Sequence, residues 1–314
     1  SLADRIDSGQ DQTFAVRPSP MPDAVHQPTR YTFSEAGRLR RDPYAIYARR
    51  ILKLDPMAEY NRDPGVRERG NIYHTIVENF VRSGIDPRAD GAWPALLEII
   101  ERTFEGAELP AHIDAGWRPR SVDMARQFLA FEAERRPTIQ SIHAEVNAWM
   151  ETAGGLIVSG RADRIDLRRD GRAEIIDYKT GLSPSLKEAR TLLDPQLALE
   201  AAALRAGAFK GVKPADVDDL TYVRLRPGRG FKAETVNNDK TQRTKPEDRK
   251  SAEQLGEESL SQLIKLTDAL KYKRAGFKSR VAPFKDSDHG GDYDHLARVA
   301  EWSSADQDEE VADE

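Results

Sequence analysis

Two apolar segments, each carrying a carboxylate, are separated by a single turn signal in this chain. LIVSGRADRIDLRR (156–169) holds Asp163, and RAEIIDYK (172–179) holds Asp177. The Asp-Gly pair between them is typical of the tight turn of a β-hairpin. The sequence therefore predicts two neighbouring antiparallel strands that bring both carboxylates close together.

The surroundings of these acids favour a site with a cation. Asp163 and Asp177 follow apolar residues, where an unpaired charge is costly to bury. Lys179 lies two residues beyond Asp177, so both side chains point to the same face of the strand. Two neighbouring carboxylates repel each other unless a cation lies between them, and oxygen ligands favour Mg²⁺ or Mn²⁺. For Asp163 alone, a structural salt bridge with Arg161 or Arg164 is the simpler interpretation.

Three more polar residues are candidates for the same site. His74 lies in the predicted amphipathic helix GNIYHTIVENFVRSG (70–84). Glu145 lies in the strand predicted before the hairpin, and Gln196 opens the helix predicted after it, where an amide can orient a water or a phosphate. The alternative interpretations are a structural or exposed role for His74, a cross-strand salt bridge for Glu145, and a helix cap or surface amide for Gln196.

The hydrophobic periodicity predicts an α/β domain with a central mixed sheet flanked by helices. Helices are expected first, with Pro43 separating two short ones. A three-stranded antiparallel meander follows, then a helix and two more strands. The predicted organisation is an extended arm (1–30), a helical part (31–137), a sheet core (138–236), a mobile loop (237–253), a C-terminal helix and packing segment (254–303) and an acidic disordered tail (304–314).

Composition removes several kinds of chemistry. None of the 314 residues is cysteine, which excludes disulfides, thiolate zinc sites, cysteine nucleophiles and cysteine-held iron–sulfur clusters. This absence fits a reducing cytoplasm, and no apolar run approaches the ~20 residues of a membrane helix, so we expect a cytoplasmic protein without a membrane partner.

Any contact with nucleic acid must be local, because the net charge is −5. The segment YVRLRPGRG (222–230) sets Arg224, Arg226 and Arg229 beside the predicted site, where they are candidates for phosphate contacts. Ordinary surface arginines explain the same pattern equally well. The chain has no phosphate-binding loop of the form G-x-x-x-x-G-K-[ST], so it has no motor of its own.

The strings GNIYH, EV (145–146), GRADRIDL, IIDYKTG and DPQLALEAAAL, in this order and spacing, closely resemble the RecB-like branch of the PD-(D/E)XK nucleases. The resemblance implies a restriction-endonuclease-like fold and Mg²⁺-dependent hydrolysis of phosphodiester bonds. It also implies roles for particular residues: metal ligation by His74, Asp163, Asp177 and the Tyr178 carbonyl, catalysis by Lys179 with both acids and Gln196, and support from Glu145.

The flanking strings RRDPYAIYARRILKL (40–54) and DYDHLARVAEWS (292–303) are similar to the C-terminal nuclease region of the B subunits of bacterial AddAB-type helicase-nucleases. This implies a larger subunit, an AddA-like partner that carries the motor, and action on 5′-ended single-stranded DNA during double-strand-break processing. In many of these B subunits, four cysteines hold an iron–sulfur cluster that stabilises this region. Here Asp42 replaces the first cysteine, so the ends must close by packing, with Arg49, Arg50 and Trp302 as candidates.

Two other functional classes fit parts of the pattern. A stand-alone RecB-like exonuclease would share the core motifs but not the flanking strings, and would not copurify with a helicase. A non-catalytic module would bind DNA or a partner without cutting. The intact set of motif residues argues against the second class.

Overall fold

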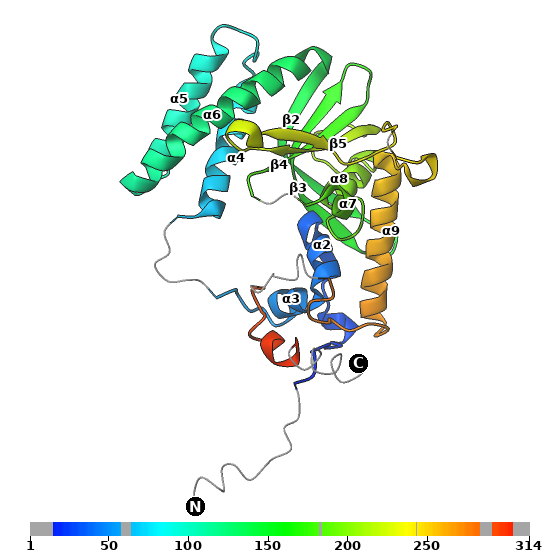
Figure 1. Ribbon diagram of the computed structural model, residues 1–314. Coiled ribbons are helices and arrows are strands. Elements are labelled where there is room, and N and C mark those ends of the chain that lie inside the picture. The colour runs from blue at the N-terminus through cyan, green and yellow to red at the C-terminus, as the bar shows by residue number, and fades with distance from the viewer. Residues whose placement is uncertain (1–14, 58–63, 182–183, 243, 283–290, 304–314) are drawn as a thin grey trace, which may run out of the picture. The chain divides into compact units, whose positions relative to one another are not determined.

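The computed structural model describes residues 15–57, 64–181, 184–242, 244–282 and 291–303 (Figure 1). The chain divides into two compact units. Unit 1 comprises Ser1–Pro28, Arg38–Ala58 and Leu266–Glu314, and unit 2 comprises Thr29–Gly37 and Glu59–Lys265. All candidate site residues belong to unit 2.

A six-stranded mixed sheet forms the centre of unit 2 (Figure 1). The strand order is β1-β3-β4-β5-β6, with β2 paired to β3. The strands β2, β3 and β4 form the predicted antiparallel meander, β5 is parallel to β4, and β6 is antiparallel to β5. The strand bounds are Arg30–Thr32 (β1), Ile139–Glu151 (β2), Ile157–Arg168 (β3), Ala173–Lys179 (β4), Val217–Arg224 (β5) and Lys232–Thr235 (β6).

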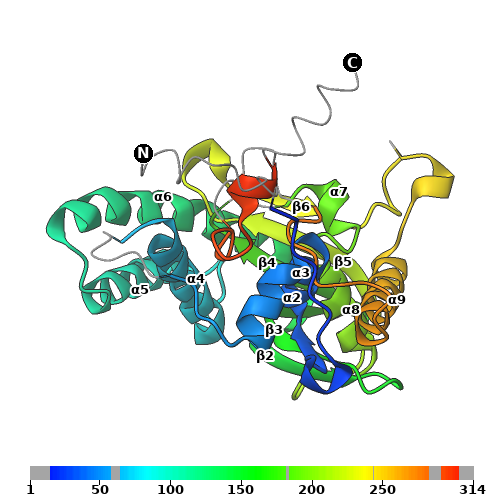
Figure 2. The ribbon, with the colours of Figure 1, turned by 90° about the horizontal axis from the view of Figure 1, so that it is seen from below.

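Helices cover both faces of β4 and β5, as predicted. Ile176, Tyr178 and Val223 point into a core formed with α4, α5 and α6. Asp177 alternates with these residues on β4 and bonds Gln196 of α8, so α8 covers the opposite face. Figure 2 shows α4 to α6 grouped on one side of β4 and α8 on the other. The helix bounds are Val66–Ser83 (α4), Ala92–Gly106 (α5), Ala111–Arg135 (α6), Leu186–Ala189 (α7) and Gln196–Arg205 (α8).

The helices α2 (Phe33–Arg41) and α9 (Ala252–Lys271) each contribute residues to both units. Pro43 starts α3 (Pro43–Ile46) directly after α2, as predicted for a residue that cannot continue the preceding helix. None of the helices in the described part of the chain is long and apolar enough to cross a membrane.

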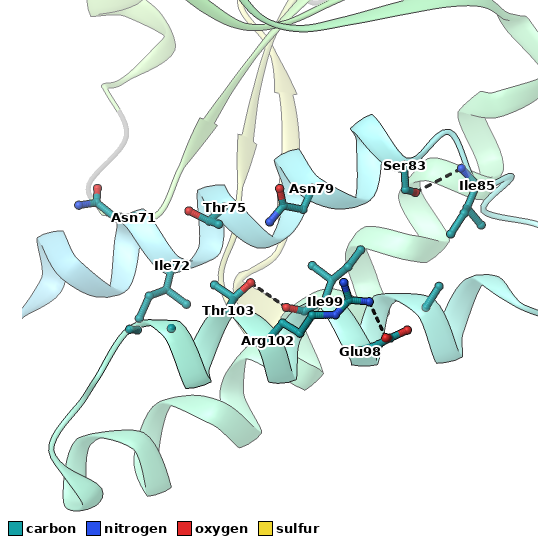
Figure 3. Close-up of a pocket in the computed structure, with 13 residues that line it drawn as sticks. Asn71, Ile72, Thr75, Asn79, Ser83, Ile85, Glu98, Ile99, Arg102 and Thr103 are labelled. Carbon is teal, nitrogen blue, oxygen red and sulfur yellow. Dashed lines mark hydrogen bonds and ion pairs between the residues drawn. The ribbon is translucent and has the colours of Figure 1, made fainter.

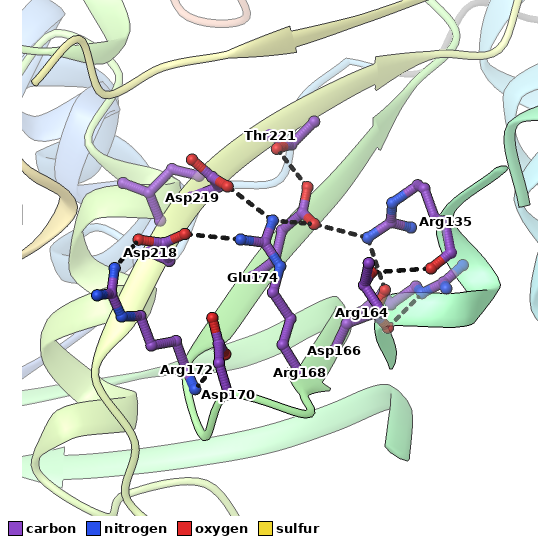
Figure 4. Close-up of polar contacts among 12 residues, drawn as sticks. Arg135, Arg164, Asp166, Arg168, Asp170, Arg172, Glu174, Asp218, Asp219 and Thr221 are labelled. Atoms are coloured by element: carbon purple, nitrogen blue, oxygen red, sulfur yellow. Dashed lines mark hydrogen bonds and ion pairs between the residues drawn. The ribbon is translucent and has the colours of Figure 1, made fainter. Parts of the chain in front are cut away.

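A buried network of charged side chains ties α6 to the sheet (Figure 4). Arg164 of β3 is fully buried and pairs with Glu132 of α6 at 2.6 Å and with Asp166 at 2.7 Å. Arg135 of α6 reaches Asp166 and Glu174, each at 2.7 Å. A buried charge is stable only when oppositely charged partners surround it. These contacts therefore restrict how α6 can be positioned against β3 and β4.

Unit 1 brings the two flanking strings together. Tyr44 and Ala48 of the first string pack with Tyr293, Ala297 and Trp302 of the second in one buried cluster. The guanidinium of Arg17 lies 4.9 Å from the centre of the Trp302 ring. The prediction that the ends pack together with Trp302 is confirmed, whereas contributions from Arg49 and Arg50 stay predictions.

The predicted boundary segments are described only in part. Residues 1–14 of the arm and the tail 304–314 lie outside the described residues. In the segment 237–253, the buried Asn238 side chain accepts a hydrogen bond from the Lys250 main chain at 2.7 Å. Mobility of this loop stays a prediction.

Candidate active site

The hairpin of β3 and β4 places the two predicted acids side by side. Arg164 pairs with Ile176, so the next position along this register puts Asp163 opposite Asp177. The Asp163 carboxylate accepts a hydrogen bond from the Tyr178 main chain at 2.9 Å. The alternative was a structural salt bridge of Asp163 with Arg161 or Arg164. Instead, Arg161 pairs with Glu145 and Arg164 pairs with Glu132.

Lys179 lies beside the pair of carboxylates. Its ammonium lies 2.8 Å from the Asp177 carboxylate, which is only 3% exposed. Burial alone would lower the pKa of Lys179, but the Asp177 charge outweighs it and the pKa lies above its ordinary value. Burial, and then repulsion from Asp177, raise the pKa of Asp163 to about 8. The closeness of the two carboxyl groups therefore disfavours a second negative charge at this point, even with Lys179 beside Asp177.

Helix α4 brings His74 to the same point. The His74 Nδ1 atom lies 3.7 Å from an Asp163 carboxylate oxygen, and burial lowers the pKa of the imidazole, which favours its neutral form. A Cβ atom on Gly70 would stand 2.6 Å from the Thr180 hydroxyl, so glycine permits α4 to approach the end of β4 this closely. A neutral imidazole is the form that binds metal ions.

Helix α8 supplies an amide in its first turn and an unpredicted acid one turn later. Gln196 donates from Nε2 to Asp177 at 2.6 Å and to Glu200 at 3.2 Å, and its oxygen accepts from Lys179 at 3.4 Å. Glu200 is fully buried, and within the described part of the chain its second carboxylate oxygen has no hydrogen-bond partner. The signal in the sequence was an acid one turn beyond Gln196 in an otherwise apolar helix.

Glu145 enters the site from β2. Its backbone has φ = 55°, a strained value for a residue other than glycine, and its carboxylate lies 2.5 Å from the Arg161 guanidinium. With His74, Glu78 and Asp163 it lines a small cavity between α4 and the hairpin. Burial raises the pKa of Glu145. A supporting role for Glu145 stays a prediction.

A second hollow borders α4 and lacks the candidate residues in its lining. Asn71, Thr75 and Asn79 of α4 face Glu98 and Arg102 of α5 across a groove of about 770 Å³ (Figure 3). Arg102 and Glu98 pair with each other at 2.5 Å. The groove is therefore a packing boundary between two helices, whereas His74 lines the cavity beside the acids.

The three predicted DNA-binding arginines have different surroundings. Arg224 pairs with Glu234 at 2.9 Å, and Arg226 donates to the Gly181 carbonyl, directly after the β4 motif. Arg229 is exposed in a turn after β5. Contacts of these arginines with phosphate stay predictions.

The donor set fits a divalent cation. Two carboxylates and a main-chain carbonyl are the oxygen ligands that Mg²⁺ and Mn²⁺ prefer, and the neutral imidazole adds one nitrogen donor. Among the described residues, no group of three histidine or acidic side chains is already arranged as a metal cage. Repulsion between Asp163 and Asp177 is what a cation would relieve, and Lys179 now supplies part of that compensation.

Comparison with known proteins identifies a family for the chain. The chain matches the family model described as the PD-(D/E)XK nuclease superfamily over residues 30–283. It is 29% identical over 185 residues to an "Uncharacterized protein" of Rickettsia bellii, covering 58% of this chain and 22% of that protein. "Uncharacterized protein RC0550" of Rickettsia conorii is 28% identical over 189 residues, covering 58% and 23%.

The chain thus spans about a quarter of the length of these curated relatives. A solved chain titled "Crystal structure of SSO0001" aligns with a TM-score of 0.31 and 13% identity, covering 78% of this chain and 89% of that one. The family match extends over most of the sequence and includes the hairpin, α4 and α8. The chain belongs to the PD-(D/E)XK nuclease superfamily.

Proposed function

We propose that this chain is a Mg²⁺-dependent nuclease domain that hydrolyses phosphodiester bonds of single-stranded DNA. The observation that carries the proposal is the contact of Asp177 with both Lys179 and Gln196, on the strand beside Asp163. Family membership supports the reaction class. Single-stranded DNA as substrate is supported by the resemblance of the motifs to the RecB-like branch.

Asp163, Asp177, the Tyr178 carbonyl and His74 would hold the cation, which would polarise the scissile phosphate and lower the pKa of a bound water. The raised pKa of Lys179 keeps its ammonium charged, so it acts as a hydrogen-bond donor rather than as a base. From its place beside Asp177, Lys179 positions the attacking water and stabilises negative charge that develops on the phosphate.

Gln196 sets the direction of the Lys179 ammonium. Its amide nitrogen is held by two carboxylates, so its oxygen is turned toward Lys179. Bonds to two acceptors fix which end of the amide faces the ammonium. Gln196 therefore limits the positions that Lys179 can take beside the phosphate.

The proposed biological setting is a bacterial AddAB-type helicase-nuclease, in which this domain would cut the 5′-ended strand during end resection and recombinational repair. The similarity of residues 40–54 and 292–303 to the B subunit supports this setting, and these segments share one buried cluster. The greater length of the curated relatives is compatible with a nuclease domain within a larger subunit. Copurification with an AddA-like helicase would separate this setting from a stand-alone exonuclease.

A metal-dependence experiment tests the reaction. Purified protein is mixed with end-labelled single-stranded and duplex DNA in Mg²⁺, in EDTA, and in EDTA followed by excess Mg²⁺. We expect cleavage of the single strand in Mg²⁺, no cleavage in EDTA, and recovery on adding Mg²⁺ back. Cleavage that persists in EDTA, or no cleavage under any condition, would contradict the proposal.

Glu200 is expected to act through Gln196. Glu200→Leu removes one of two acceptors of the Gln196 amide, so we expect kcat to fall about tenfold with KM little changed, the effect of one lost hydrogen bond. Glu200→Gln keeps a carbonyl acceptor and should recover most of kcat. Steady-state cleavage kinetics of both variants check this, and equal losses in the two would show that the amide bond is not the cause.

A further inference from the structure

We propose that a groove around Trp149 is a subsite where a base of single-stranded DNA stacks beside the candidate active site. This inference rests on the proposed nuclease function and names the part of the substrate that the groove would hold. The groove has a volume of about 580 Å³. Its lining includes Arg30, Asn147, Trp149, Ser159, Arg161 and Lys210.

Trp149 supplies an aromatic surface in this groove. It lies on β2 and is 53% exposed, although a tryptophan usually buries most of its ring. The Arg30 guanidinium lies 5.5 Å from the centre of the ring. More than half of the side chain stays exposed with Arg30 in place, so a base can stack on the uncovered part. Base–aromatic stacking accepts every base, which suits a nuclease without sequence preference.

Three cationic side chains give the groove the charge that a phosphate backbone requires. Arg30 and Lys210 join Arg161, whose side chain is 61% exposed even while it pairs with Glu145. The Lys210 main chain donates to the Asn147 carbonyl at 2.9 Å, which holds the segment after α8 against the edge of β2. Cations around an exposed aromatic ring are the pattern that binds single strands.

The groove adjoins the candidate active site. Trp149 is opposite Ser159 and Asn147 is opposite Arg161 in the β2–β3 register. Asp163 lies four residues beyond Ser159 on β3, about 13 Å along an extended strand. Glu145 joins the two sites, because it pairs with Arg161 of the groove and lines the cavity that contains Asp163. A strand cut at Asp163 can therefore place a nearby base on Trp149.

Binding without cleavage tests the subsite. A dye-labelled twelve-residue oligothymidylate is titrated with protein in EDTA, and the dissociation constant is measured by fluorescence anisotropy. We expect Trp149→Ala to raise Kd about tenfold, and Trp149→Phe to stay within about threefold, because the phenyl ring keeps a stacking face. Lys210→Gln should reduce the slope of log Kd against log salt by about one.

Trp93→Ala is the matched control. Trp93 lies on α5, outside the groove, and has its own arginine, with the Arg126 guanidinium 4.7 Å from its ring centre. Loss of an aromatic ring at that place should leave Kd within twofold of wild type. Thermal melting of each variant shows whether a change in Kd comes from unfolding, and Lys210→Gln tests the groove without touching the indole.

The outcomes separate the subsite from the function. If Trp149→Ala binds like wild type, or if Trp149→Phe binds as weakly as Trp149→Ala, the stacking subsite is wrong, whether or not the protein cuts in Mg²⁺. If binding depends on Trp149 but wild-type protein does not cut in Mg²⁺, the proposed reaction is wrong and the subsite stands. If wild-type protein does not bind the oligonucleotide, the subsite is overturned.

Discussion

Asp177→Ala is expected to slow DNA cleavage at least about a thousandfold in saturating Mg²⁺. The change removes a proposed metal ligand and also the ion pair that holds Lys179, at 2.8 Å, beside the phosphate. Loss of one preorganised electrostatic contact costs 10²- to 10³-fold in comparable sites, and this variant loses two. Single-turnover cleavage of an end-labelled oligonucleotide measures the effect.

The fold of Asp177→Ala should survive. Asp177 repels Asp163, so removing one of two crowded carboxylates relieves a strain at the same time as it removes a partner of Lys179. We expect the variant to remain folded, since these two effects oppose each other and Asp163 remains beside the Lys179 ammonium. Urea unfolding without metal checks this expectation.

Asp170→Ala is the matched control for Asp177→Ala. Asp170 is the exposed acid in the turn of the same hairpin, where it accepts a hydrogen bond from the Arg172 main chain at 3.0 Å. The Asp170→Ala substitution removes a negative charge from the hairpin without changing the candidate active site, so cleavage should continue at the wild-type rate. If Asp177→Ala cleaves DNA at the same rate as Asp170→Ala, the proposed active site is wrong.

The core of the site was predictable because its signals are local. The Asp-Gly turn and the alternation around it determine that β3 and β4 pair, and this pairing alone places Asp163 beside Asp177. His74 carried no such signal, because a helix histidine looks the same whether it faces a site or solvent. Its place depends on the approach of α4 to Thr180, which Gly70 permits.

Features that depend on distant contacts were not predictable. β1 is only three residues long, too short to show a period, and it forms by pairing with β3 more than 120 residues later. Glu200 cannot be identified from the sequence, because its burial depends on the way α8 packs on β4 and β5. The sequence suggests Arg164 as a salt-bridge partner of Asp163, but Arg164 points to the other face of β3, toward Glu132 of α6.

Arg164→Met is expected to lower the free energy of unfolding by about 3–5 kcal/mol. Arg164 is fully buried, and its guanidinium contacts Glu132 at 2.6 Å, Asp166 at 2.7 Å and the Tyr178 hydroxyl at 3.1 Å. Methionine fills much of the same space but leaves two acids partly unpaired in the interior. Breaking a buried ion pair by removing one partner has this cost because the remaining charge is uncompensated.

A second substitution separates loss of charge balance from loss of packing. Glu132→Leu in the Arg164→Met background removes one stranded carboxylate, so we expect part of the lost stability to return. The exposed Arg172, which pairs with Asp218 at 2.6 Å, is the matched control, and Arg172→Met should leave the free energy of unfolding close to that of wild type. Urea unfolding of the four proteins measures these differences. If Arg164→Met is no less stable than Arg172→Met, the network does not hold α6 to the sheet. Tyr178, whose main chain lies beside the candidate metal ligands, would then depend on apolar packing alone.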